Sequence, residues 1–109
     1  MQSQKQHQIN ALLARLAAEY IHATASKISM ITVTHADVSP DAKNATVYVS
    51  VLPESSEHSA LDFLRRSRAD IREYIKQNTK LRVLPFIDIE LDYGEKNRQR
   101  VQELSQKAQ

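Results

Sequence analysis

The chain has 109 residues, of which 26% are charged and 41% hydrophobic, a composition typical of an ordinary globular protein. The absence of cysteine excludes disulfides, thiolate zinc sites and cysteine nucleophiles, and the single glycine excludes glycine-rich phosphate-binding loops. No apolar run approaches the ~18 residues of a membrane-spanning helix, and the N-terminus lacks the apolar stretch of a signal peptide. We therefore expect a complete, cytoplasmic protein with a single domain over residues 1–109, in which 1–4 and about 105–109 are disordered.

Positive charge is concentrated in one stretch of the chain. Fifteen Lys and Arg against thirteen Asp and Glu give a net charge of only +2. The segment from Arg65 to Arg82, however, holds seven cations and two acids, so it carries +5 and the remainder carries −3. This distribution is a stronger indication of an anionic partner than the total charge.

The N-terminal half predicts a helix followed by a β-hairpin. Residues 4–24 carry apolar side chains at helical spacing, which predicts an amphipathic helix that covers a core. Met30–Val38 is rich in β-branched residues and Ala45–Val51 alternates strictly, so both are predicted strands. Because residues 39–43 supply turn chemistry between them, we expect the two strands to pair antiparallel.

Residues 60–79 return to helical spacing, but their apolar stripe is interrupted at Ser67 and Arg68. Ser67-Arg-Ala-Asp70 fits the S/T-x-x-D/E capping pattern that marks a helix N-terminus. The pattern therefore favours two helices joined by a kink at 67–69, although one continuous helix with an incidental serine fits the spacing equally well. Ser59-Ala-Leu-Asp62 fits the same pattern at the expected start of the first helix.

A third strand is predicted from Pro85 to Leu91, where apolar and polar residues alternate. The proline argues for an edge strand or for the opening residues of a strand. We expect residues 95–109 to form a short helix or a frayed tail. The order α-β-β-α-kink-α-β-(α) predicts an α+β fold, a two-layer α/β sandwich with a three-stranded mixed sheet and helices on one face. The other face is expected to present Thr32, Thr34, Tyr48, Ser50, Asp88 and Glu90.

Catalytic and metal-binding patterns are weak in this sequence. The histidines are scattered without a ligand spacing, at His7, His22, His35 and His58. Asp88 and Glu90 share one face of a strand, which a solvated sheet surface explains more simply than acid–base catalysis does. We expect neither an enzyme nor a bound metal or cofactor, and a small hydrolase built on Asp88, Glu90 and His35 stays only a formal alternative.

The basic stretch places its cations at helical spacing in one column. The column comprises Arg65, Arg68, Arg72, Lys76 and Lys80, with Arg82 nearby. Aligned guanidinium groups can each bind a phosphate, so the column predicts contacts with a nucleic-acid backbone. A helix restarting at Ser67 would add free N–H groups beside Arg65 and Arg68, although Asp70 partly fills that positive end. A solvated helix face that happens to be basic is the alternative.

Two stretches carry a family resemblance: Val38-Ser-Pro-Asp-Ala-Lys-Asn-Ala-Thr-Val-Tyr-Val-Ser-Val-Leu52 and Leu81-Arg-Val-Leu-Pro-Phe-Ile-Asp-Ile-Glu-Leu-Asp92. With weaker matches at Asp92-x-Gly94 and Arg100-Val-x-x-Leu104, the chain resembles the ribosome-binding factor A family over about residues 5–107. That family resembles a type II K-homology domain in which a helix–kink–helix with an A-x-G element replaces the G-x-x-G loop. The matching positions here are Ser67, Arg68 and Ala69, without the glycine.

The resemblance implies a non-enzymatic assembly factor. Such a factor would bind the immature small (30S) ribosomal subunit and its 16S rRNA, and would support late maturation of the rRNA 5′ region and growth in the cold. We expect the six cations from Arg65 to Arg82 named above to contact phosphates, in a protein that is monomeric when free and has no membrane or small-molecule partner. The alternative is a protein-interaction module of the same fold that docks through the exposed sheet face and the third strand.

Overall fold

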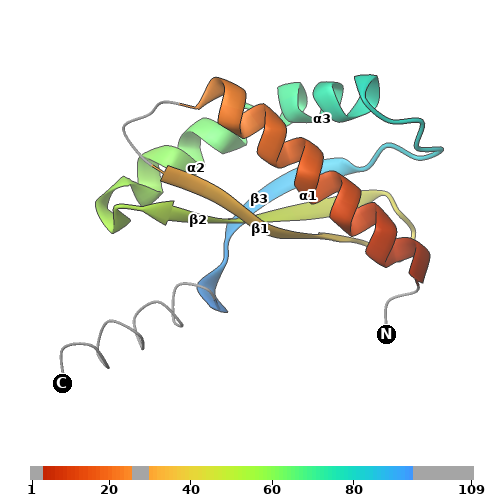
Figure 1. Ribbon diagram of the computed structural model, residues 1–109, viewed down its shortest axis with the longest axis horizontal. Helices are drawn as coiled ribbons and strands as arrows, with labels where there is room; N and C mark the ends of the chain where they lie inside the picture. The colour runs from red at the N-terminus through yellow and green to blue at the C-terminus, as the bar shows by residue number, and fades with distance from the viewer. Residues whose placement is uncertain (1–3, 26–29, 95–109) are drawn as a thin grey trace.

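The computed structural model describes residues 4–25 and 30–94. Its elements follow one another as α1 (Gln4–Thr24), β1 (Met30–Val38), β2 (Asn44–Leu52), the 3₁₀ turn η1 (Glu54–Ser56), α2 (Glu57–Arg66), α3 (Arg68–Gln77) and β3 (Phe86–Leu91) (Figure 1). Gln4, which was predicted to be disordered, is the first residue of α1. The other positions predicted to be disordered, and the predicted tail over 95–109, lie outside the described residues. Within the described part of the chain, no helix is long and apolar enough to cross a membrane.

The three strands form one mixed sheet in the order β1-β2-β3. β1 and β2 pair antiparallel as the hairpin pattern predicts, and β2 and β3 pair parallel because α2 and α3 return the chain to the same end of the sheet. The α+β fold and the mixed sheet are therefore confirmed. Pro85 directly precedes β3, which is an outer strand, so the expectation drawn from the proline also holds.

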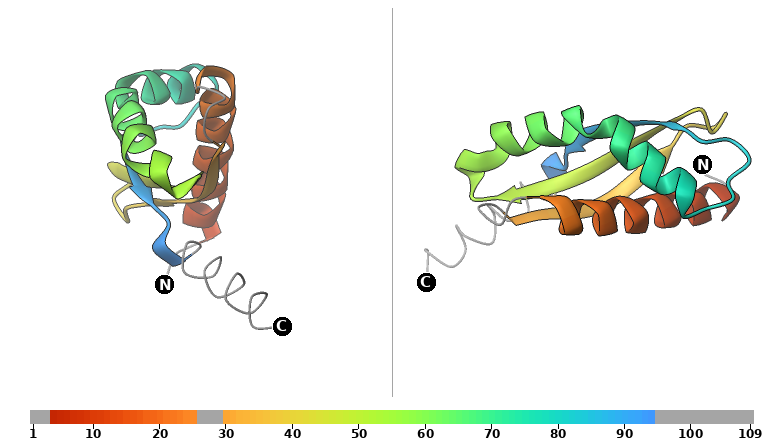
Figure 2. Two further views of the ribbon diagram at one scale, coloured as in Figure 1. Left: turned by 90° about the vertical axis from the view of Figure 1, so that its left-hand side faces the viewer. Right: turned by 90° about the horizontal axis from the view of Figure 1, so that it is seen from above.

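The core lies between the sheet and the three helices, which cover one face of it (Figure 2). On β2 and β3 the buried residues alternate with more exposed ones, as at Val47, Val49 and Ile89, which are fully buried. Leu13 of α1 and Leu64 of α2 are buried against them. Burial of each such side chain contributes about 1.5–3 kcal/mol relative to leaving it in water, so this alternation holds the two layers together.

A β-bulge in β1 changes which residues face the core. Ile31 and Val33 pack against the core, but the register shifts between Val33 and His35, and after the shift Ala36 and Val38 are the buried residues. One extra residue in the strand reverses the alternation. The bulge therefore brings His35 onto the helix-free face, opposite Tyr48.

Two helices, not one, connect β2 to β3, and the break falls at Ser67. The predicted capping role of Ser67 is wrong, because its hydroxyl donates a 2.9 Å hydrogen bond back to the Phe63 carbonyl. Its backbone (φ −92°, ψ 5°) lacks the extended conformation of a typical N-cap residue. Of these two helices, α2 starts at Glu57, two residues before the cap predicted at Ser59. No side chain caps its N-terminus either.

Candidate nucleic-acid interface

The predicted column of cations divides into two halves with different contacts. The arginine half, on α2 and α3, consists of Arg65, Arg68 and Arg72. The lysine-rich half, at the end of α3 and in the loop to β3, consists of Lys76, Lys80 and Arg82. The helical spacing does bring the three arginines to one side, as predicted, and that side packs against β3.

Arg72 is tied to the chain just before β3. Its Nε donates to the Pro85 carbonyl and its Nη2 to the Leu84 carbonyl, both at 3.0 Å, and the side chain is partly buried. Its guanidinium also lies over the Phe86 ring, 4.6 Å from the ring centroid. Charge-assisted hydrogen bonds are about twice as strong as neutral ones, so Arg72 fixes the entry to β3.

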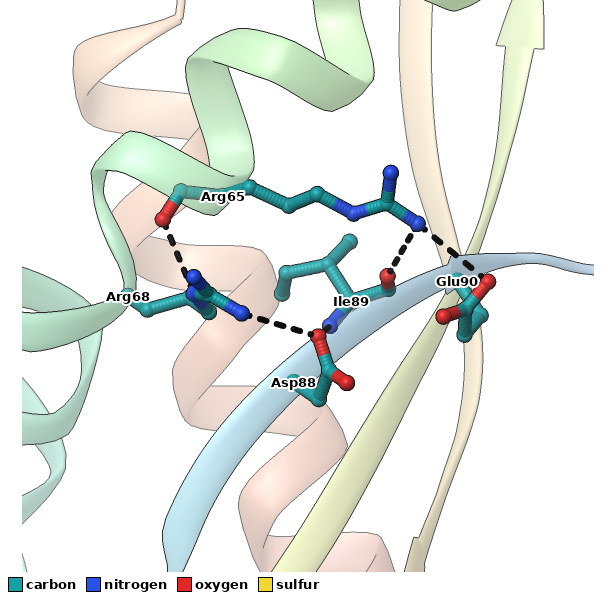
Figure 3. A network of polar contacts seen from close by, with 5 residues as sticks. All are labelled: Arg65, Arg68, Asp88, Ile89 and Glu90. Carbon is teal, nitrogen blue, oxygen red and sulfur yellow. Dashed lines mark hydrogen bonds and ion pairs between the residues drawn. The ribbon is translucent and has the colours of Figure 1, made fainter.

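Arg65 and Arg68 reach over β3 to its carboxylates (Figure 3). Arg65 Nη2 lies 3.3 Å from both Glu90 Oε2 and the Ile89 carbonyl oxygen. Arg68 Nη1 lies 3.3 Å from Asp88 Oδ1, and its Nε donates to the Arg65 carbonyl at 3.0 Å. These four side chains are about half exposed, and ion pairs of this kind contribute only about 0–1 kcal/mol each.

The same contacts cap the free edge of the sheet at one residue, Ile89. Even-numbered residues of β3 bond to β2, as the bond from the Phe86 N–H to the Lys43 carbonyl shows, so the odd-numbered residues direct their backbone groups outward. At Ile89, the outward carbonyl accepts from Arg65 and the N–H donates to Asp88 Oδ1 at 2.8 Å. Capped groups cannot pair with another strand, which disfavours strand addition at Ile89, in the middle of β3.

The lysine-rich half is exposed. The side chains of Lys76, Lys80 and Arg82 form no ion pair or hydrogen bond with any residue in 4–25 or 30–94. Arg66 of α2 is also exposed, and its side chain donates only to the Asp62 carbonyl of its own helix. Among the predicted site residues, the lysine-rich half therefore offers charge that no described acid compensates.

Two hollows flank the helix break and share Arg68. One, of about 370 Å³, is lined by Asp62, Arg65, Arg66 and Arg68. The other, of about 540 Å³, lies between α3 and β3 and is lined by Arg68, Ala69, Arg72, Glu73, Phe86 and Ile87. Ser67, by contrast, is buried, so of the predicted kink motif only Arg68 and Ala69 face the hollows. The N–H groups that begin α3 have no side-chain cap.

The helix-free face carries a cluster that the sequence analysis missed. His35 and Tyr48 stack with ring centroids 4.4 Å apart and an interplanar angle of 10°. Thr34, the bulged residue, donates to Asp92 Oδ2 at 2.6 Å, and His35 Nδ1 lies 3.4 Å from the same oxygen. The switch of apolar positions from 31 and 33 to 36 and 38 was the signal for this bulge.

The formal hydrolase alternative finds no support in this geometry. Asp88 and Glu90 pair with arginines, whereas His35 contacts Asp37 and Asp92 instead. Within residues 4–25 and 30–94, no group of three or more His, Asp or Glu side chains could hold a metal ion.

Comparison with known proteins identifies the family. The family described as "Ribosome-binding factor A" matches residues 2–105. The chain belongs to the ribosome-binding factor A family. A ribosome-binding factor A of Clostridium acetobutylicum is 40% identical over 65 residues, which span 59% of this chain and 54%, about half, of that relative.

Solved structures of the family share the fold. The crystal structure of ribosome-binding factor A from Thermus thermophilus superposes with a TM-score of 0.71 at 26% identity, covering 79% of this chain and 94% of that chain. A homology model of the Thermus thermophilus factor, fitted into a cryo-electron microscopy map of a 30S complex, superposes with a TM-score of 0.65 at 28% identity and covers 74% of this chain and 88% of that one. The α+β architecture described above is thus that of the family.

Proposed function

We propose that this chain is a non-catalytic factor that binds the small (30S) ribosomal subunit through phosphates of its 16S rRNA and supports late processing of the rRNA 5′ end in the cytoplasm. Family membership and the 30S complex of the Thermus thermophilus relative support the subunit as partner. The observation that carries the RNA contact is the exposed lysine-rich half, adjacent along α3 to the hollow that contains Arg68 and Arg72.

The two halves contribute differently to the proposed contact. The cations of the lysine-rich half can bind phosphates without first breaking an ion pair to a described residue. Arg65 and Arg68 must exchange a carboxylate for a phosphate, which costs little because their pairs are half exposed and weak. Arg72 is held by two carbonyls, so its role is to fix the groove rather than to supply a free charge.

Co-sedimentation with purified small subunits at two salt concentrations tests the proposal. The triple variant Lys76→Gln, Lys80→Gln, Arg82→Gln should bind more weakly at low salt. The slope of log K against log salt should fall by up to about 3, which is about one for each phosphate that the variant no longer binds. The matched control Lys5→Gln, Arg15→Gln, Lys43→Gln removes the same charge from exposed positions elsewhere and should retain most of the affinity. Equal binding by both triple variants and the wild type contradicts the proposed contact.

The proposed processing role needs a cellular measurement. Cells depleted of this protein should accumulate small-subunit rRNA with unprocessed 5′ ends and should grow poorly in the cold, and the wild-type gene should restore both. Mature 5′ ends in depleted cells, mapped by primer extension, contradict the role in processing while leaving subunit binding intact.

A second candidate function, protein docking through the helix-free face, is favoured by the exposed stack of His35 on Tyr48. It predicts binding to an isolated protein partner that is insensitive to salt and is lost in the double variant His35→Ser, Tyr48→Ser. The same variant should bind small subunits normally if the lysine-rich half carries the interaction.

A further inference from the structure

The helix-free face of the sheet is acidic. The α-helices of the described residues all lie on the opposite face (Figure 2). The three strands contain three acids, Asp37, Asp88 and Glu90, and no lysine or arginine. These acids point to the helix-free side, because their neighbours along each strand are buried in the core. Each acid is about half exposed, so this face attracts cations although the whole chain has a net charge of +2.

The strand register places the acids on both sides of a neutral central strand. Thr46 of β2 pairs with Asp37 of β1 and with Asp88 of β3, and Tyr48 pairs with Glu90 two residues further along the same face. Neighbouring strands lie about 4.8 Å apart, so the acids of the outer strands flank a track about 10 Å wide along β2. An α-helix with its side chains is about 10–12 Å in diameter, so one helix matches the width of this track.

The centre of the track is neutral and partly apolar. Tyr48 stacks on His35, with ring centroids 4.4 Å apart, in the middle of the face. At one end of the sheet Leu52 pairs with Met30, and these two side chains are 48% and 65% exposed. Leu52 lies on the helix-free side because its neighbour Val51 is buried in the core, and a direct cross-strand partner shares its face. The face therefore combines apolar surface along its centre with acids on its flanks.

The acids of β3 keep acceptor capacity for a cationic partner. Asp88 accepts from Arg68 and from the Ile89 N–H through Oδ1, and Glu90 accepts from Arg65 through Oε2. Among the described residues, no donor binds the other oxygen of either carboxylate. Since an ionised carboxylate can accept about four hydrogen bonds, a partner can bind these acids without displacing the arginines.

We propose that the helix-free face binds a basic amphipathic helix of a partner protein. The apolar stripe of this helix lies along β2, over Tyr48 and Leu52. Lysines or arginines on the two flanks of the stripe contact Asp37 on one side and Glu90 on the other. The inference is independent of the proposed RNA contact, whose exposed cations lie at the end of α3 and in the loop after it. It differs from docking through the stack of His35 on Tyr48 alone, because the acids make the binding depend on salt.

A synthetic peptide tests the surface. The probe is a fluorescein-labelled, fourteen-residue peptide of leucine and lysine whose leucines form one helical face. Fluorescence anisotropy should show that the wild type binds it, more weakly as salt is added, and does not bind the same peptide with glutamate in place of lysine. Backbone amide chemical shifts should change along β2, at Thr46, Tyr48 and Ser50, and not along α3. Failure of the wild type to bind the lysine peptide, or shift changes confined to α3, overturns the proposal.

Charge variants locate the contact on the face. The double variant Asp88→Asn, Glu90→Gln should bind the lysine peptide about 3- to 10-fold more weakly than the wild type, because two exposed charge contacts are lost. The matched control Asp70→Asn, Glu73→Gln removes two exposed acids from α3 and should bind the peptide as the wild type does. Urea unfolding midpoints close to the wild-type value show that both variants are folded. Equal losses of affinity in the two double variants overturn the proposal.

Replacement of Tyr48 tests the neutral centre of the track. Tyr48→Ser removes the ring and should weaken binding of the lysine peptide, whereas Tyr48→Phe keeps the ring and should bind as the wild type does. The salt dependence should stay unchanged in both, because neither variant alters a charge. Full affinity of Tyr48→Ser overturns the placement of the apolar stripe along β2.

Other occupants of the face give different results. If the face is an interface between two copies of this chain, sedimentation equilibrium of the protein alone should show a dimer that Tyr48→Ser dissociates. If it binds RNA, a single-stranded RNA of ten adenosines should change the amide shifts along β2. Either result overturns the proposal of a basic helix. Co-sedimentation of the lysine-rich triple variant with small subunits decides the proposed function independently of the peptide.

Discussion

The two halves of the cationic column differ in what their side chains contact and in where they lie, because α3 ends at Gln77 and only Lys76 of the lysine-rich half is on the helix. The arginine half contacts the carbonyls and carboxylates of β3 and the residues before it. The lysine-rich half, which continues the column beyond β3, extends into solvent. The side chains suit these tasks, because the planar, multidentate guanidinium can bind two acceptors at once, whereas the ammonium group is a compact, strongly hydrated charge. A run of cations can therefore combine a structural clamp with an exposed binding surface.

The largest expected difference between the two halves is in stability, and replacing Arg72 should show it. Arg72→Met removes two charge-assisted hydrogen bonds from the partly buried carbonyls of Leu84 and Pro85, and should lower the free energy of unfolding by about 2–3 kcal/mol. Lys76→Met, one turn further along α3, should change it by no more than about 0.5 kcal/mol. Urea unfolding followed by circular dichroism measures both, and equal effects contradict the division into two halves.

Removing the carboxylates should convert part of the arginine half into free charge. The double variant Asp88→Asn, Glu90→Gln releases Arg65 and Arg68 from their ion pairs and makes the surface more positive by two charges. We expect small-subunit affinity at low salt to rise about 3- to 10-fold, since each pair is worth at most about 1 kcal/mol. A variant with unchanged affinity and salt slope would indicate that Arg65 and Arg68 serve only the edge of the sheet.

The smallest effect is expected for the ion pairs themselves. Arg65→Met and Arg68→Met should each cost about 1 kcal/mol of stability, because each removes an ion pair together with a hydrogen bond to a backbone carbonyl, that of Ile89 for Arg65 and that of Arg65 for Arg68. Thermal unfolding at low and high salt separates the two contributions, since salt screens the ion pairs and leaves the carbonyl bonds in place. Costs that vanish at high salt would show that the carbonyl contacts contribute nothing.

Most of the fold could be predicted from periodicity, because burial imposes it. The valines of β2 alternate as the structure buries them, and the gap at Ser67 marked the helix break. The wrong detail was the cap, since the S/T-x-x-D/E pattern cannot show whether a hydroxyl accepts from the next turn or donates to the previous one. The bulge in β1 was visible in the switch between apolar positions 33 and 36, which a strict two-residue period passes over.

The candidate site was predictable only in part. Helical geometry alone places Arg65, Arg68 and Arg72 on one side, so the column could be expected. The acidic partners of the column could not be predicted, because Asp88 and Glu90 lie some twenty residues further along the chain. They come under the arginines only when β3 pairs parallel to β2. For the same reason, no sequence pattern joins Phe86 to Arg72.

The hydrogen bonds from Arg72 to the carbonyls of Leu84 and Pro85 also affect the affinity of the protein for a partner. The connection from α3 to β3 is anchored at one end by the helix and at the other by this side chain, and Leu81 N–H is tied to Thr79 Oγ1 within it. Lys80 and Arg82 are thus presented from a short segment whose backbone freedom is already restricted before any encounter. Preorganisation of this kind lowers the entropic cost of association, so a residue inside the fold tunes the affinity of cations that it does not touch.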